Sequence, residues 1–283
     1  MRSFFIAKCG RSAYIKYMRL FDLHNDIMTS LLALDEKKRH MQSFAREEND
    51  IIYAIWATKL DCEKFREYAK FLCDNSFMFA IEDAGAVGMC LLDNPPPNFM
   101  YCSLTWNEDN VYAGGALGNG NLTPVGKAFI DKLNKWNTPV DLAHLNSKSF
   151  YAAADISYRP FVSHTGLASC LSCPRNISDS QVRFIIEKNG IVGLSPVPAF
   201  VPGGNSKGYF YTINYFLDKF GGDHLAVGSD FYGCAPINNL DDYESLTGEL
   251  YCNTAARYGE KTARKILYEN AHNFFKVHDE SVY

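Results

Sequence analysis

Imidazole and carboxylate side chains stand directly after short apolar runs at several places in this sequence. His24 and Asp26 are two residues apart near the start, Glu82 comes later, and His144 and His164 follow two further runs. Imidazole nitrogen and carboxylate oxygen are both good ligands for Zn²⁺ and for several other divalent metals. Five such ligands are too many for one tetrahedral zinc but suit two ions that share a bridging carboxylate. These residue types therefore predict two Zn²⁺ ions per chain, with other divalent metals as an alternative.

A site with two metal ions points to hydrolysis, because ions about 3.5–4 Å apart hold a bridging hydroxide and polarise the carbonyl group that it attacks. Each residue also has an ordinary explanation. Glu82 alone could be a solvated charge. His144 could pair only with Asp141, and His164 could cap a loop. The whole set is harder to explain as core filling, because unpaired charges are costly to bury.

The spacing of His24 and Asp26 fits a strand, where side chains alternate and residues two apart share one face. The pattern predicts that this imidazole and this carboxylate point into the same site. Asp22 has the same spacing and is expected to point the same way, with a structural or supporting role.

Eight short apolar runs are bounded by Gly, Pro, Asn or Asp, which is typical of buried strands. The runs are Leu20–Leu23, Ile51–Ala57, Phe77–Ile81, Met100–Leu104, Pro139–Ala143, Pro160–Ser163, Gly190–Leu194 and Leu225–Gly228. Helical patterns lie between most of them, at Asp61–Asp74, Thr123–Asn137, Ser178–Lys188 and Tyr209–Phe220. Such alternation predicts an α/β protein with parallel strands and helical crossovers.

Eight strand–helix units favour a closed (β/α)₈ TIM barrel, although an open doubly wound sheet has much the same local pattern. The residues at the strand ends decide between the two. Barrel enzymes carry their active sites at the carboxyl ends of the strands, and the candidate ligands stand there. The prediction is therefore a metal-dependent (β/α)₈ barrel.

An ordered set of motifs makes the resemblance specific. The motifs are Asp22-Leu23-His24-Asn25-Asp26, Ile81-Glu82, Asp141-Leu142-Ala143-His144, Ser163-His164-Thr165, Arg175-Asn176-Ile177-Ser178-Asp179 and Gly228-Ser229-Asp230-Phe231. In order and spacing, from about Leu20 to Phe275, the chain resembles the renal (membrane) dipeptidase family of zinc metallopeptidases, as a short member of microbial type. The resemblance implies hydrolysis of a dipeptide's amide bond through a metal-bridging hydroxide, with tolerance for a D-residue at the C-terminal position.

The resemblance also implies a role for each matching residue. His24 and Asp26 would bind one zinc, Glu82 would bridge both ions, and His144 and His164 would bind the other.

Three further residues would act on the substrate. Arg175 would hold the C-terminal carboxylate of the dipeptide, which suits a bidentate guanidinium. Asp230 would take a proton from the attacking water and pass it to the leaving amine. In the family a histidine often follows Leu-Thr at the end of the fourth strand, but here that residue is Trp106. Trp106 has only an indole N–H to donate, and it is expected to line the substrate pocket.

Two other functions stay open. One is a different amidohydrolase-type reaction, on a lactone, a β-lactam or an N-acyl amino acid, since a fold does not fix the substrate. Arg175 separates the two, because a substrate without a free carboxylate has no use for it. The other is a catalytically weak binding protein, which Trp106 favours and the retained metal ligands oppose.

Composition narrows the class of protein. The chain has 283 residues, 47% of them hydrophobic and 21% charged, and a net charge of −4. A nucleic-acid binder should show a basic surplus, and a membrane span needs about 18 consecutive apolar residues; neither is present. The nine cysteines are an odd number in a large chain, which argues against a secreted disulfide framework and agrees with a reducing compartment.

The expected organisation is one barrel domain over residues 18–283, with residues 1–17 as a tail outside the core. No secretory signal is evident in that tail, so the cytoplasm is the expected location. The expected partner is a small dipeptide substrate, and a homodimer is left open.

Overall fold

The computed structural model describes residues 18–46, 49–91 and 94–276. Eight parallel strands form a closed barrel in which each strand pairs with the next in sequence and β8 pairs with β1. They are β1 (Phe21–Asn25), β2 (Asp50–Trp56), β3 (Phe79–Glu82), β4 (Phe99–Ser103), β5 (Val140–Asp141), β6 (Pro160–Thr165), β7 (Val192–Leu194) and β8 (Leu225–Val227). The eight predicted strands and the closed barrel are confirmed. The expectation for residues 1–17 falls outside the described residues.

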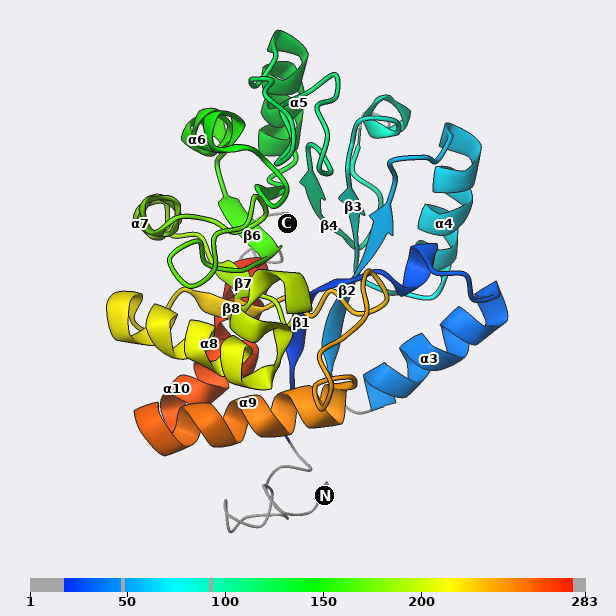
Figure 1. Ribbon diagram of the computed structural model, residues 1–283. Helices are drawn as coiled ribbons and strands as arrows, with labels where there is room; N and C mark the ends of the chain where they lie inside the picture. The colour runs from blue at the N-terminus through cyan, green and yellow to red at the C-terminus, as the bar shows by residue number, and fades with distance from the viewer. Residues whose placement is uncertain (1–17, 47–48, 92–93, 277–283) are drawn as a thin grey trace.

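Helices surround the barrel (Figure 1). They are α3 (Leu34–Arg46), α4 (Cys62–Asp74), α5 (Pro124–Lys135), α6 (Ser147–Ile156), α7 (Asp179–Glu187), α8 (Ser206–Phe220), α9 (Tyr243–Tyr258), α10 (Glu260–Arg264) and α11 (Asn270–Lys276). Short helical turns are η1 (Ile27–Thr29), η2 (Gly88–Cys90), η3 (Pro198–Phe200), η4 (Pro202–Gly204) and η5 (Lys265–Glu269). The four predicted helices are confirmed to within three residues at each end. In the described part of the chain, no helix combines the length and the apolar character needed to cross a membrane.

The start of α7 is fixed by a reciprocal cap. Ser178 Oγ accepts a hydrogen bond from the backbone N–H of Gln181 (3.3 Å), and Gln181 Oε1 accepts one from the N–H of Ser178 (2.8 Å). This capping box satisfies two N–H groups that the helix itself leaves unpaired. It anchors the end of the segment that carries Arg175, three residues earlier.

Side chains fill the barrel interior below the mouth. Helix α11 closes the lower end, where Phe275 stacks on Phe21 at 5.8 Å between ring centroids. The members of this inner cluster are Phe21, Leu23, Ile52, Ala80, Tyr101, Phe161, Ile191, Ala226, Ala271, Phe274 and Phe275. Because this end is packed, a ligand reaches the barrel interior from the carboxyl ends of the strands.

Strand β5 is shorter than the predicted Pro139–Ala143. Only Val140 and Asp141 pair with the neighbouring strands. The chain then turns, with the N–H of Leu145 bonded to the carbonyl of Leu142 (3.3 Å) and His144 in a left-handed conformation (φ 68°). His144 is therefore presented by a tight turn, not by the strand.

Cys62 and Cys90 form a disulfide, with their Cα atoms 5.7 Å apart. The other described cysteines form no disulfide, so this single bond is not the disulfide framework that the cysteine count argued against. Cys62 begins α4 after β2, and Cys90 lies in η2 after β3. These neighbouring strands bring the two segments together across 28 residues of sequence, which no sequence spacing reveals.

Candidate metal centre

The five predicted metal ligands meet at the carboxyl ends of the strands, and all five are buried. Glu82 Oε1 lies 2.7 Å from His144 Nε2 and 3.5 Å from His164 Nε2. Glu82 Oε2 lies on the other side, 3.7 Å from His24 Nε2, which is 3.3 Å from Asp26 Oδ2. The two oxygens of one carboxylate thus face two separate groups of ligands.

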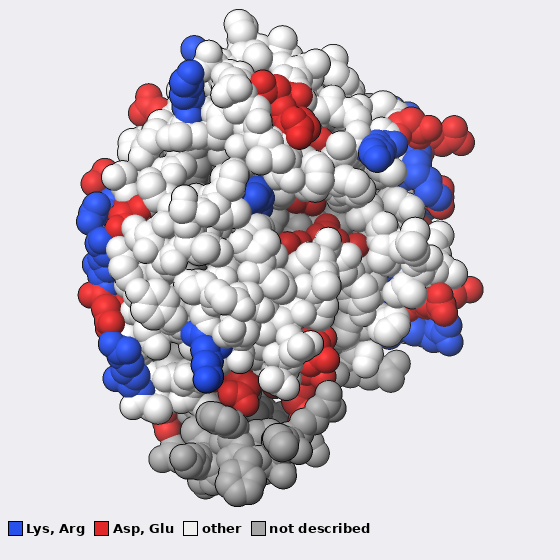
Figure 2. Space-filling model, in the orientation of Figure 1, with Lys and Arg blue, Asp and Glu red and all other residues white. Residues whose placement is uncertain are grey.

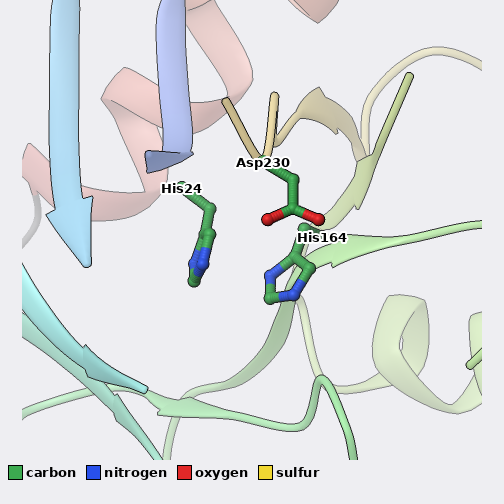
Figure 3. Close-up of side chains that lie close together, drawn as sticks. All are labelled: His24, His164 and Asp230. Carbon is green, nitrogen blue, oxygen red and sulfur yellow. The ribbon is translucent and has the colours of Figure 1, made fainter. Parts of the chain in front are cut away.

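Asp230 joins this set from the turn after β8. Figure 3 shows its carboxylate directed toward the rings of His24 and His164, and the potential ligand atoms of these three residues lie within 4.8 Å of one another. The structure thus brings together all six predicted residues that carry imidazole or carboxylate groups. Asp230 is less deeply buried than the two histidines.

Two of the histidines are oriented by hydroxyl groups. His24 Nδ1 lies 2.8 Å from the hydroxyl of Tyr101, which itself donates to the carbonyl of Leu23 (2.8 Å). His164 Nδ1 lies 2.8 Å from Ser163 Oγ, which donates to Asp141 Oδ2 (2.6 Å). Because each hydroxyl already uses its proton, each Nδ1 must be the donor. Each Nε2 then presents a lone pair to the centre.

His144 is oriented by an amide. Its Nδ1 lies 2.9 Å from Asn107 Oδ1, an acceptor, so Nε2 again carries the lone pair. Asp141 bonds to Ser163 and to the N–H of Ala143, so the alternative in which His144 pairs with Asp141 is wrong.

These contacts fit a divalent cation. His144 Nε2 and His164 Nε2 are 3.0 Å apart, and two lone pairs at that distance repel unless a positive charge lies between them. His24 Nε2 and Asp26 Oδ1 are buried and have no hydrogen-bond partner among the described residues. Unpaired buried polar atoms are costly, and cation binding would satisfy them.

The protonation states differ among the three histidines. Burial lowers the pKa of His144 to about 4 and holds that of His164 well below its ordinary value, so both rings are neutral at pH 7, as metal ligation requires. In spite of burial, the pKa of His24 is raised well above its ordinary value by Tyr101, Asp26 and Glu82, so a cation at its Nε2 would take the place of a proton. Burial alone would raise the pKa of Glu82, but His24, and then His144, hold it well below its usual range. Burial, and then the neighbouring Asp26, raises the pKa of Asp230 well above that of an ordinary carboxyl.

The backbone has a left-handed conformation at two residues of the centre and directly after a third. Asp83, His144 and Asp230 have φ values of 67°, 68° and 57°, in a left-handed region that costs about 1–3 kcal/mol for such residues. Asp83 directly follows Glu82 and is held by hydrogen bonds from Thr58 (2.8 Å) and Asn110 (2.7 Å). Such strain persists only where surrounding contacts impose it, and it is concentrated at functional sites.

A glycine near Asp230 makes room for two carboxylates. A Cβ on Gly233 would overlap Asp26 Oδ2 and Asp230 Oδ1. A larger residue at this position would push these side chains out of place.

The expectation that alternation along one strand places His24 and Asp26 on the same face is wrong in its geometry. Strand β1 ends at Asn25, its register shifts between Asp22 and Asn25, and Asp26 precedes η1 as its N-cap. Asp22 does not point into the centre. It accepts hydrogen bonds from Ser229 N (2.7 Å), Ser229 Oγ (2.5 Å) and the hydroxyl of Tyr243 (2.6 Å), so it joins β1 to β8 in the expected structural role.

Arg175 lies beside the centre and is 9% exposed. One N–H makes a long hydrogen bond to the carbonyl of His164 (3.4 Å), and the guanidinium lies 5.2 Å from the ring of Phe200. Among the described residues these contacts leave most of its five donors for a ligand. A cavity of about 90 Å³ is lined by Arg175, His144 and segments after β5 and β6. A larger hollow of about 580 Å³ lies at the carboxyl ends of α5 and α6, lined by none of the site residues.

Trp106 lies next to the centre, with its ring 6.0 Å from that of His144. It also contacts Trp56, the last residue of β2, at 5.4 Å and an interplanar angle of 62°. Sequence reasoning missed Trp56 and Asn107. Their positions at or just after strand ends were the available signal, but no charge drew attention to them.

The mouth of the barrel is hollowed on the face shown in Figure 2. Carboxylate residues line its floor, and most of the surrounding rim is uncharged. The hollow thus offers anionic ligands to a cation at its base and an uncharged approach to a small molecule.

The contact of Asn107 with His144 leads to a testable prediction. Replacing Asn107 by leucine keeps the side-chain size but removes the acceptor that fixes the imidazole. Loss of such a supporting hydrogen bond typically weakens metal binding by about 10–100-fold. Titration of the metal-free protein with zinc against a competing chelator measures this loss.

The matched control is Asn253→Leu, since Asn253 is an exposed residue of α9 that bonds to the carbonyl of Glu249. This control should bind zinc like the unaltered protein. Equal zinc affinity in the two variants would show that Asn107 does not orient His144.

The chain is similar to known dipeptidases in sequence and to known metallopeptidases in fold. A family model described as membrane dipeptidase, peptidase family M19, matches residues 99–281. An uncharacterised protein from the pqqA 5′ region of Klebsiella pneumoniae is 28% identical over 181 residues, which cover 58% of this chain and 67% of that protein. An uncharacterised dipeptidase of Schizosaccharomyces pombe is 29% identical over 168 residues, which cover 56% of this chain and 41% of that protein. The match thus spans about two fifths of the yeast dipeptidase.

Solved structures share the fold over nearly the whole chain. A metallopeptidase from Rhodobacter sphaeroides, solved with a phosphinate mimic of the dipeptide L-Ala-D-Ala, has a TM-score of 0.75 and 18% identity, covering 92% of this chain and 99% of its own. A metallopeptidase called dipeptidase AC has a TM-score of 0.74 and 19% identity, covering 92% and 98%.

Proposed function

The chain belongs to the membrane dipeptidase family, peptidase family M19, and from that premise we propose that it hydrolyses the amide bond of dipeptides with two bound Zn²⁺ ions. The observation that carries the proposal is the position of Glu82. Its two oxygens face two separate ligand groups, His144 with His164 and His24 with Asp26. A carboxylate placed in this way suits the bridging position between two ions.

His24 and Asp26 would hold one ion, and His144 and His164 the other. Neutral imidazole and carboxylate form a donor set that suits zinc. When bound, the two cations would polarise the amide carbonyl and lower the pKa of water so that hydroxide is available at neutral pH.

Arg175 would bind the C-terminal carboxylate of the substrate, since its guanidinium can donate two parallel hydrogen bonds to a carboxylate. Arg175 contacts the backbone of His164, itself a predicted ligand. The carboxylate would therefore lie about one residue away from the carbonyl that is attacked. This proximity favours dipeptides over longer peptides.

Asp230 would move the proton. It faces His24 and His164 (Figure 3), and a carboxylate beside two cations would stay ionised until it accepts a proton from the attacking water. The same carboxyl would then donate that proton to the nitrogen of the leaving amino acid. Asp230 adopts a left-handed backbone conformation at this position.

The substrate would include dipeptides with a D-residue on the C-terminal side. The support is the Rhodobacter sphaeroides metallopeptidase, which holds a mimic of L-Ala-D-Ala in the same fold. L-Ala-D-Ala is therefore the first substrate to test.

The purified protein should release free alanine from L-Ala-D-Ala when zinc is present. Removal of zinc by a chelator should abolish the release, and added zinc should restore it. The bound cations would supply the polarisation of the carbonyl and the lowered pKa of water on which the reaction depends. Alanine is measured by an amine-specific assay, and the metal content of the same sample by elemental analysis. Protein that holds two metals but cleaves neither this substrate nor a small dipeptide panel would overturn the proposal.

A further inference from the structure

We propose that Trp56 and Trp106 form the binding surface for the side chain of the substrate's N-terminal residue, and that dipeptides with an apolar N-terminal residue are preferred. This inference rests on the proposed dipeptidase function. It assigns a role to Trp56 and gives Trp106 a defined one.

The order of the strands places Trp56 and Arg175 on opposite sides of the barrel. Strands β2 and β6 are four places apart in a closed ring of eight, so they lie on opposite sides. Trp56 ends β2, and Arg175 lies in the segment after β6, in contact with His164. A dipeptide with its carboxylate at Arg175 and its amide carbonyl at the centre must extend its N-terminal residue toward β2 and its neighbours.

The two tryptophans lie close to the bond that would be hydrolysed. Trp56 pairs with Glu82 in the register of β2 and β3, so the tryptophan starts level with the proposed bridging carboxylate. Trp106 lies 6.0 Å from the ring of His144. The two indoles, 5.4 Å apart, therefore stand next to the centre, at the carboxyl ends of β2 and β4.

The surface that the two tryptophans expose is mainly apolar. Both tryptophans are partly exposed, while Trp56 Nε1 is buried and has no hydrogen-bond partner among the described residues. The accessible part of Trp56 is therefore the carbon of its ring. Aromatic faces of this kind favour apolar and aromatic groups.

The carboxylate of Asp83, directly after Glu82, accepts hydrogen bonds from neighbouring residues. Asp83 Oδ2 accepts a hydrogen bond from Thr58 (2.8 Å), and Asp83 Oδ1 accepts from Gly85 N (2.9 Å) and Asn110 (2.7 Å). Asp83 is buried, and three of its roughly four acceptor positions are taken. It therefore offers little to a lysine or arginine side chain at the N-terminal position.

The test compares L-Leu-Ala with L-Asn-Ala, which share the C-terminal alanine and have N-terminal side chains of similar size. The unaltered enzyme should show a kcat/KM for L-Leu-Ala higher by about 10-fold or more, the effect of burying a few apolar groups. In Trp56→Ala this ratio should fall to within about three-fold, and Trp56→Phe should keep an intermediate ratio. The ratio within one preparation does not depend on the fraction of folded protein.

Trp136→Ala is the matched control, since Trp136 directly follows α5 as its C-cap, at the end of the barrel remote from the strand carboxyl ends. Its ratio should equal that of the unaltered enzyme. Dipeptide hydrolysis with similar rates for both substrates, or an unchanged ratio in Trp56→Ala, overturns this inference and leaves the proposed function intact. Absence of hydrolysis for any dipeptide overturns both.

Discussion

The Glu82→Gln variant should lose both its paired metal ions and its activity, with kcat/KM reduced by about 10³-fold or more, comparable to the loss of a principal catalytic group. One oxygen of Glu82 faces His144 and His164, and the other faces His24. A glutamine of the same shape has one weaker oxygen and an NH₂ group, which cannot ligate a cation. Elemental analysis of the metal content and steady-state kinetics with L-Ala-D-Ala measure the two effects.

Glu67→Gln provides the matched control. Glu67 is an exposed residue of α4 whose carboxylate pairs with Lys64 at 2.8 Å, and such surface pairs contribute little. This variant should keep full metal content and activity. Two metals and normal kinetics in Glu82→Gln would rule out the bridging role of Glu82.

The Arg175→Ala variant should raise KM for dipeptides by about 100-fold, because a bidentate, charge-assisted pair with a carboxylate contributes about 3 kcal/mol. The loss should be specific to the carboxylate. A dipeptide amide, which lacks that group, should be hydrolysed with similar kcat/KM by both enzymes. Kinetics with L-Ala-D-Ala and with its C-terminal amide separate this role from general damage to the site.

Arg183→Ala is the corresponding control, since Arg183 lies on α7 with its guanidinium 5.7 Å from the ring of Phe220. It should leave KM for both substrates unchanged. If Arg175→Ala weakens the amide as much as the free dipeptide, Arg175 does not recognise the carboxylate. The wider amidohydrolase alternatives, lactones or β-lactams, would then be the next substrates to test.

The sequence determined the architecture and the ligand types. Each strand is a local run of apolar residues with turn residues at its ends, and such runs are typical of buried strands. Parallel strands in a barrel present their carboxyl ends on one face. The polar residues that follow those runs, such as Glu82 and His164, were therefore predicted to meet, and they do.

Only the tertiary structure decided how each group is held. Residues at strand ends leave the regular alternation: Asp26 is placed by a register shift and a helical turn, and His144 by a left-handed turn. A sequence pattern fixes the period of an element, but not the conformation of the turn that ends it.

The partners that orient the site were also invisible in the sequence. Asn107 is 37 residues from His144, Tyr101 is 77 from His24, and Cys62 is 28 from Cys90. These pairs form because barrel closure brings side chains of neighbouring and facing strands, and of the loops after them, into contact, and their residue types are ordinary in any fold. The sequence therefore indicated which side chains could bind metal, while the closed barrel determined which atoms of those side chains face each other.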